Sequence, residues 1–212
     1  MRLLLTGPEP FGGESVNPSG EVVRALEADT PPDVELTPMI FAVHFRSVAN
    51  RVLPALDSGA HDAWLGVGEA GSRPHVSVER IGIDVFVDAA LPVSQRDEVP
   101  IREDGLDDYF ARMPLQELAS TMRDARVPTI VSNTAETYCC NESLPTVQHH
   151  LAETRGAIPS GFIHLPSLPD QVANKLAGTL LMAFATQLLG IRTAIEAMRE
   201  LVAAVTPELA RT

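Results

Sequence analysis

The sequence has little that would suit a membrane or a nucleic acid. Of its 212 residues, 16 are Lys or Arg and 28 are Asp or Glu, which gives a formal net charge of −12 at pH 7. So acidic a chain repels phosphate backbones and anionic lipid headgroups, so neither nucleic acids nor bilayer surfaces are expected partners. No apolar run reaches the ~18 residues of a spanning helix, and the N-terminus lacks the apolar region of a signal peptide. We therefore expect a cytoplasmic protein.

Cysteine is scarce as well. The two cysteines, Cys139 and Cys140, are adjacent. A disulfide between sequence neighbours is strained, which excludes a disulfide scaffold, and the absence of a second pair excludes a cysteine-rich metal site. Both residues are therefore expected to be free thiols.

Several motifs of nucleotide and hydrolase chemistry are missing. The sequence contains no P-loop, no G-x-S-x-G nucleophile elbow and no H-E-x-x-H zinc motif. Gly66-x-Gly68-x-x-Gly71 matches the dinucleotide-binding pattern literally, but Ser72-Arg73-Pro74 follows, so no helix opens there. We interpret this match as chance.

The composition does suit a folded domain, with 45% hydrophobic and 21% charged residues, and the length suits one domain over residues 1–212. Short apolar runs predict strands at Leu3–Thr6, Val34–Phe41, Asp62–Val67, Thr129–Ser132 and Gly161–Leu165. Helical spacing predicts helices that start at Asn17-Pro18-Ser19 or cover Val43–Leu56, Pro114–Ala125, Asn141–Thr154 and Val172–Val205. This alternation predicts an α/β fold with a mostly parallel sheet and helices on both faces.

The pattern also makes predictions about particular residues. His75–Ile83 is expected to form another strand and to pair with Asp84–Leu91 as a hairpin. Pro145 should lie in the first turn of its helix, because proline lacks the N–H that later helical positions donate. The long C-terminal helix is expected to break at Gly178 and Gly190.

Residues that can carry chemistry follow strands, where α/β proteins place their sites. Cys139-Cys140-Asn141 comes after the strand at Thr129–Ser132 and begins a helix, whose positive end stabilises a thiolate. A thiol without such help is only a few per cent ionised at neutral pH. The alternative is that both cysteines are small buried hydrophobic residues.

A histidine and an acid are candidates to assist the thiol. His164 ends the apolar run Gly161-Phe162-Ile163, where it could exchange a proton near pH 7, although a structural role is the alternative. Glu79 lies between Val78 and Ile81 in a strand-like stretch and could orient an imidazole. An exposed pair with Arg80 is the alternative for Glu79.

Blocks along most of the chain resemble, in order, the pyrrolidone-carboxyl peptidases, the cytosolic cysteine-type pyroglutamyl peptidases. The two most specific are Ser132-Asn133-Thr134-Ala135-x-Thr137-Tyr138-x-Cys140-Asn141 and Gly161-Phe162-Ile163-His164-Leu165-Pro166-x-Leu168-Pro169-x-Gln171. The others include Leu4-Leu5-Thr6-Gly7, Pro10-Phe11-Gly12-Gly13, Asn17-Pro18-Ser19, Gly71-x-Arg73-Pro74 and Glu79-Arg80.

The resemblance implies an α/β/α sandwich with a mixed, mostly parallel central sheet. It implies hydrolysis of the amide bond after an N-terminal pyroglutamyl residue of a peptide, through a thioester acyl-enzyme and without metal or cofactor. Cys140 would be the nucleophile, by the x-Cys-Asn pattern, with His164 as base and then acid and Glu79 as the orienting acid. It also implies a homotetramer. Substrate contacts would fall on Phe11, Pro8, Asn17, Glu69, Leu91, Tyr138 and Cys139.

The sequence departs from the family where the substrate would be recognised. Pro8 replaces a usual aromatic residue, Glu69 a glutamine, Ala90 an arginine, and Cys139 a small aliphatic residue. A carboxylate at position 69 can only accept hydrogen bonds, for instance from the lactam N–H. Two alternatives therefore stay open, namely a binding or scaffold homologue with little turnover, and an amidohydrolase for another small acyl amide.

Overall fold

A six-stranded sheet, in the order β2-β1-β3-β10-β4-β9, forms the centre of the molecule. The computed structural model describes residues 1–88, 91–154, 158–173, 175 and 178–209, with only the backbone of residues 205–209. The sheet strands are β1 (Arg2–Pro8), β2 (Glu35–Phe41), β3 (Ala63–Glu69), β4 (Val76–Glu79), β9 (Thr129–Ser132) and β10 (Ser160–Leu165). Shorter strands form two additional pairs and are β5 (Ile81–Ile83), β6 (Phe86–Val87), β7 (Glu98–Val99) and β8 (Asp108–Phe110).

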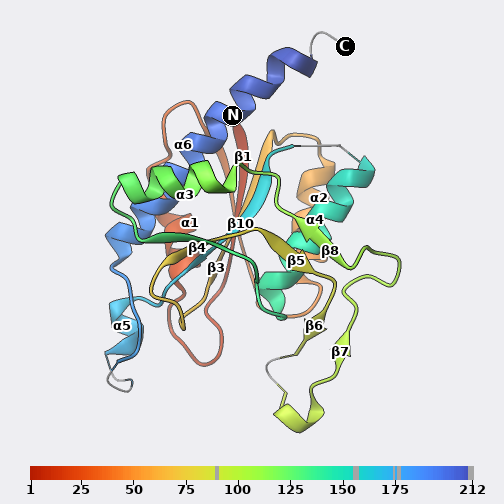
Figure 1. Ribbon diagram of the computed structural model, residues 1–212, viewed down its shortest axis with the longest axis vertical. Helices are drawn as coiled ribbons and strands as arrows, with labels where there is room; N and C mark the ends of the chain where they lie inside the picture. The colour runs from red at the N-terminus through yellow and green to blue at the C-terminus, as the bar shows by residue number, and fades with distance from the viewer. Residues whose placement is uncertain (89–90, 155–157, 174, 176–177, 210–212) are drawn as a thin grey trace.

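The helices cover both faces of this sheet (Figure 1). They are α1 (Pro18–Ala28), α2 (Ser47–Asp57), α3 (Leu115–Asp124), α4 (Cys139–Thr154), α5 (Pro169–Val172) and α6 (Phe184–Leu209), with a 3₁₀ turn η1 (Val93–Gln95). Strands β2, β1, β3 and β10 are parallel, whereas β4 runs antiparallel to β10 and parallel to β9. The predicted α/β fold with a mixed, mostly parallel sheet is confirmed.

Alternation along the strands creates two cores, because successive side chains point to opposite faces. Leu3 and Leu5 of β1 belong to the core beneath α1, α3 and α6. Leu4 of the same strand joins Trp64 and Phe162 in the core beneath α2 and α4. The face toward α2 and α4 is the one that carries the candidate site.

Three predictions about local structure were wrong. The strand expected at His75–Ile83 is interrupted at Arg80, and its second part, β5, pairs with β8 rather than with Asp84–Leu91, while β6 pairs with β7. Pro145 lies inside α4, which begins at Cys139, and a Cβ on Gly82 would stand 2.5 Å from the Pro145 Cδ. The proline ring thus fits where β5 has no side chain.

The C-terminal helix also differs from its prediction. Of the helix predicted over Val172–Val205, the part before Phe184 was wrong: α5 ends at Val172, α6 begins at Phe184, and Gly178, at φ +89°, lies in the connection between them. Gly190 lies within α6 without interrupting it, where a Cβ would stand 3.1 Å from Met122 and Val127. A small residue is used there for close packing rather than for a break. No helix in the described part of the chain is long and apolar enough to cross a membrane.

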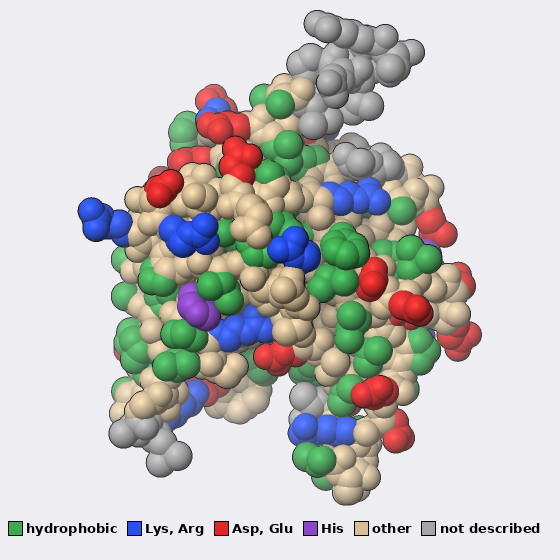
Figure 2. All heavy atoms as spheres, in the orientation of Figure 1, with side chains coloured by type: hydrophobic (Ala, Val, Ile, Leu, Met, Phe, Trp, Pro, Cys, Tyr) green, Lys and Arg blue, Asp and Glu red, His purple; other side chains and the backbone are tan. Residues whose placement is uncertain are grey.

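The space-filling view ends in two projections with a notch between them (Figure 2). One projection includes α5 and the other is formed by β6, η1 and β7, at the lower left and lower right of Figure 1. Strands β1 and β3 run toward this side of the molecule, so the carboxyl ends that usually carry sites in α/β proteins open there.

Candidate active site

Cys140 lies in the first turn of α4 and faces the sheet. A Cβ placed on Gly68 of β3 would stand only 2.9 Å from the Cys140 Sγ, so the sulfur lies directly over that glycine. The first N–H groups of a helix have no partner within it, and they favour negative charge nearby. The Cys140 sulfur therefore lies beside a group of donors suited to an anion.

Asn141 fixes this helix end to β5. Its Oδ1 accepts from the Ile83 N–H at 2.9 Å, and its Nδ2 donates to the carbonyls of Ile83 and Val85, each at 2.8 Å. The Asn141 side chain is fully buried. Removal of these bonds would leave buried backbone groups unpaired, so Asn141 holds the start of α4 against β5.

His164 and Glu79 meet on the same face of the sheet. In the antiparallel pairing of β10 with β4, Phe162 lies opposite Glu79 and His164 opposite Ser77, so His164 and Glu79 are diagonal neighbours. The His164 Nδ1 is 2.8 Å from the Glu79 Oε1, and both side chains are buried. Because Nδ1 is bonded to the acid, Nε2 is left to face Cys140.

The electrostatics couple these groups. Burial lowers the pKa of His164, but the Cys140 thiolate and the Glu79 carboxylate outweigh it and raise that pKa to about 9. Burial, reinforced by Glu142, raises the pKa of Cys139 to about 12. Of the two adjacent cysteines, Cys139 therefore stays a neutral thiol, while Cys140 has an imidazolium beside it.

Glu79 has a second cationic partner, Arg73, to which the sequence assigned no role. The Arg73 Nη1 lies 2.6 Å from the Glu79 Oε1, and the Nη2 donates to the Thr134 carbonyl at 2.9 Å. The Arg73 side chain is only 15% exposed. The guanidinium therefore joins the acid to the loop that leads to Cys140.

A largely apolar pocket adjoins Cys140 at the ends of β1 and β2. Its lining residues are Pro8, Phe11, Phe41, Val43, Val67, Tyr138, Cys139, Cys140, Ser143 and Phe162. Four of the predicted substrate contacts, Pro8, Phe11, Tyr138 and Cys139, are among them. Phe41 and Val43 were missed, although their position just at and after the end of a predicted strand is a signal that could have found them.

The other predicted contacts lie elsewhere. Both oxygens of Glu69 accept from the Gln171 Nε2, at 3.0 and 3.1 Å, and Oε1 also accepts from the Ser167 Oγ at 2.9 Å. Asn17 is buried, accepts from the Ser19 N–H at the start of α1 and donates to the Glu9 carbonyl. Leu91 is 40% exposed on the β6–η1–β7 side, and Ala90 lies outside the described residues.

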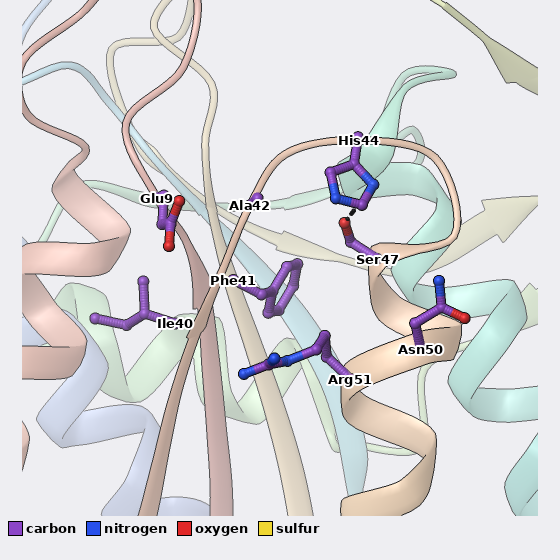
Figure 3. Close-up of a pocket in the computed structure, with 8 residues that line it drawn as sticks. All are labelled: Glu9, Ile40, Phe41, Ala42, His44, Ser47, Asn50 and Arg51. Atoms are coloured by element: carbon purple, nitrogen blue, oxygen red, sulfur yellow. Dashed lines mark hydrogen bonds between the residues drawn. The ribbon is translucent and has the colours of Figure 1, made fainter.

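A second pocket, of about 240 Å³, lies on the other side of Phe41 (Figure 3). It is lined by Glu9, Ile40, Phe41, Ala42, His44, Ser47, Asn50 and Arg51. The His44 Nδ1 lies 3.0 Å from the Ser47 Oγ at its rim. The Phe41 ring borders both pockets, but this second one contains none of Cys140, His164 and Glu79.

Comparisons with known proteins identify the family of this chain. The sequence profile of the family described as pyroglutamyl peptidase matches residues 1–201. The chain belongs to this family. Among its pyroglutamyl peptidase relatives, the pyrrolidone-carboxylate peptidase of Thermococcus onnurineus is 38% identical over 178 residues, 82% of this chain and 88% of the relative. That of Coprothermobacter proteolyticus is 34% identical over 202 residues, 94% of this chain and 97% of the relative.

Solved structures of the pyroglutamyl peptidase family share the fold. The pyrrolidone carboxyl peptidase of Thermococcus litoralis superposes with a TM-score of 0.87 at 26% identity, covering 96% of this chain and 95% of that one. A mutant pyrrolidone carboxyl peptidase of P. furiosus gives a TM-score of 0.86 at 28% identity, over 94% of this chain and 99% of that one. These similar proteins are all named peptidases, and they lend no support to a binding homologue or another amidohydrolase.

Proposed function

We propose that this chain is a cysteine exopeptidase that hydrolyses the amide bond after an N-terminal pyroglutamyl residue. The observation that carries the proposal is the buried His164–Glu79 pair beside Cys140, next to an apolar pocket, in a chain of the pyroglutamyl peptidase family. No group other than these side chains and water is needed for the reaction.

The first half of the reaction transfers the acyl group to sulfur. The Cys140 thiolate attacks the pyroglutamyl carbonyl carbon, and the negative charge on oxygen is stabilised by the unpaired N–H groups at the start of α4. The His164 imidazolium then gives its Nε2 proton to the leaving amine as the C–N bond breaks. The products are a thioester on Cys140 and a peptide shortened by one residue.

The second half releases pyroglutamate. His164, now neutral, takes a proton from water, which attacks the thioester carbonyl, and the C–S bond breaks to restore the thiolate and imidazolium. Glu79 accepts the Nδ1 hydrogen throughout, so that Nε2 is the nitrogen that exchanges protons. Glu79 also stabilises the imidazolium form that both half-reactions require.

The pocket explains a preference for pyroglutamyl over ordinary N-terminal residues. A pyroglutamyl residue carries a neutral lactam, whereas other residues carry an α-ammonium group. None of the described lining residues is an acid, and Phe11, Phe41 and Phe162 present aromatic surface. Burial of an unpaired ammonium there would be costly, so a neutral ring is favoured.

The test is release of a chromophore from a pyroglutamyl amide, run beside the matching glutamyl amide and beside Cys140→Ala. We expect cleavage of the pyroglutamyl amide alone, and none by Cys140→Ala. Preferred cleavage of another acyl amide would favour an amidohydrolase. No cleavage, with Cys140 alkylated at the rate of an ordinary thiol, would favour a binding homologue.

The remaining expectations from the family concern assembly and location. We propose the homotetramer and the cytoplasmic location as properties of this enzyme, supported by the resemblance of the sequence to cytosolic members. Sedimentation equilibrium at several protein concentrations checks the first, because a tetramer gives four times the mass of the 22.8 kDa chain. Fractionation of the source cells checks the second.

A further inference from the structure

The Glu79 carboxylate is fully buried and unevenly bonded. Oε1 accepts from the His164 Nδ1 at 2.8 Å and faces the Arg73 Nη1 at 2.6 Å. Oε2 is buried and has no hydrogen-bond partner among the described residues. A carboxylate in such a place is costly in its ionised form unless a cation compensates it.

Arg73 is placed to supply that cation. It comes from the turn between β3 and β4, and its side chain is 15% exposed. The Nη1 also lies 3.4 Å from the Ser132 Oγ, and the Nη2 donates to the Thr134 carbonyl at 2.9 Å. These contacts hold the planar guanidinium between Glu79 and the segment that follows β9, so that its position is defined on two sides.

We propose that Arg73 is a positioning residue that keeps Glu79 ionised and thereby keeps His164 in the tautomer and charge state that catalysis uses. The inference rests on the proposed triad and adds a fourth group to it. Arg73 is not among the residues that line the apolar pocket, and its contact within the proposed triad is with the Glu79 carboxylate.

The physical reason lies in the two forms of Glu79. Without Arg73, burial favours the neutral carboxylic acid. A neutral Glu79 can donate its own proton to the His164 Nδ1, which moves the imidazole N–H to Nε2 and removes its ability to take a proton there. A neutral Glu79 also withdraws the negative charge that helps to raise the pKa of His164.

Few charged or titratable groups surround this pair. Arg73 approaches Glu79 from the turn before β4, and His164 approaches it from β10. Cys140 of α4 faces the imidazole, and the exposed Glu136 reaches the guanidinium at 3.8 Å from the segment between β9 and α4. Within the described part of the chain, Arg73 is therefore the cation that contacts Glu79 besides the imidazolium itself.

The test compares Arg73→Met, which removes the charge and keeps an unbranched apolar stem, with Arg73→Lys, which keeps the charge. Arg80→Met is the matched control, because the Arg80 Nε donates to Asn133 at 2.7 Å in the same segment but does not contact Glu79. We expect Arg73→Met to lower kcat about 10- to 10²-fold with little change in KM, which is at or below the lower end of the ~10²–10⁴-fold that a positioned acid or base itself supplies. Arg80→Met should match the parent.

The pH profile separates this role from a merely structural one. In Arg73→Met, the pH profile of kcat/KM should change on its alkaline side. The alkaline limb should move down, because the pKa of His164 loses the support of the carboxylate. Arg73→Lys should keep both limits of the parent profile. If Arg73→Met does not fold, as judged by circular dichroism, Arg73→Gln removes the same charge and takes its place.

A double-mutant cycle and a second readout complete the test. In a Glu79→Gln background, loss of the Arg73 charge should have no additional effect, because there is no carboxylate left to keep ionised. An additive loss, or an unchanged profile width in both Arg73 variants, would overturn the proposal. The pH dependence of Cys140 alkylation by iodoacetamide should show the same shifts in a chain that releases no pyroglutamate, so failure of the proposed function remains distinguishable.

Discussion

The Cys140 sulfur lies directly over the Cα of Gly68, where any other residue would place its Cβ. A Cβ on Gly68 would stand 2.9 Å from the Cys140 Sγ and 2.8 Å from the Phe162 ring. Both distances are shorter than side-chain atoms tolerate without a shift. Because glycine has no side chain, the space above Gly68 is available for the Cys140 sulfur.

This contact predicts that Gly68→Ala disables the enzyme without unfolding it. The added methyl group should displace Sγ from His164, and a misplacement of about 1 Å can cost about 10²-fold in rate. We expect kcat/KM for a pyroglutamyl amide to fall by that order while circular dichroism is unchanged. Gly190→Ala, also at a close contact but in α6, is the control and should keep its activity. Full activity in Gly68→Ala would show that the Cys140 Sγ does not lie over Gly68.

The two cysteines should react differently. Burial raises the pKa of Cys139 to about 12, so it remains a thiol at neutral pH, whereas Cys140 lies beside His164. Mass spectrometry after brief treatment with iodoacetamide should find the label on Cys140. Cys140→Ser or Cys140→Ala should abolish turnover, and Cys139→Ala should keep most of it. Equal losses in both single variants would contradict the assignment.

The His164 pKa predicts how stability depends on pH. Folding raises this pKa from 6.5 to about 9, so the folded chain binds the proton more tightly than the unfolded chain. The stabilisation is full below pH 6.5 and is lost as the pH rises through 9. Urea unfolding between pH 6 and 9.5 should show this decline, and His164→Gln should lack it. A parent and variant that decline equally would show that another group is responsible.

Turnover should depend on the same residue. His164→Ala is expected to lower kcat/KM at least ~10²-fold, and Glu79→Gln to lower it less, because the orienting acid exchanges no proton with the substrate. The rate should fall above about pH 9, where His164 no longer holds the proton for the leaving amine. An unchanged rate in His164→Ala would exclude the triad.

Glu69 is one of the positions at which the sequence departs from the family where the substrate would be recognised, and this departure can be tested. Its carboxylate is engaged by Gln171 and Ser167, and burial raises its pKa. We expect Glu69→Gln to be tolerated, because an amide oxygen still accepts from both donors or from a lactam N–H. Glu69→Ala should raise KM, since it removes that acceptor and releases Gln171. Steady-state kinetics on a pyroglutamyl amide decide this, and identical constants in Glu69→Ala would remove Glu69 from substrate recognition.

The sequence could predict those features that depend on local pattern. The apolar runs at Leu3–Thr6 and Gly161–Leu165 correspond to β1 and β10, because a buried strand needs nothing beyond its own residues to be recognised. The partner of β5 could not be found in this way. The pairing of β5 with β8 joins Ile81 to Phe110, which lie far apart in the sequence, and no local pattern indicates so distant a contact.

The candidate site also contains residues that the sequence could predict and residues that only the structure identifies. Cys140, His164 and Glu79 are identifiable from residue type and from family resemblance, and the structure brings His164 and Glu79 within hydrogen-bonding distance. No role could be assigned to Arg73, although it lies in a block that resembles the family, or to Phe41, since an arginine in a turn and a phenylalanine at a strand end are ordinary in isolation. Their importance arises from what the fold places beside them.

Cys140, the proposed nucleophile, belongs to a helix, whereas His164 and Glu79, the proposed base and acid, belong to the sheet. Their alignment is therefore a measure of how firmly α4 is docked, through Asn141 on β5 and through Pro145 against Gly82. A shift of α4 would move Cys140 relative to His164 while the sheet keeps its hydrogen bonds. Such a shift would lower the activity without a change in secondary structure. In this protein, activity is therefore a more sensitive measure of how α4 packs against the sheet than the content of secondary structure is.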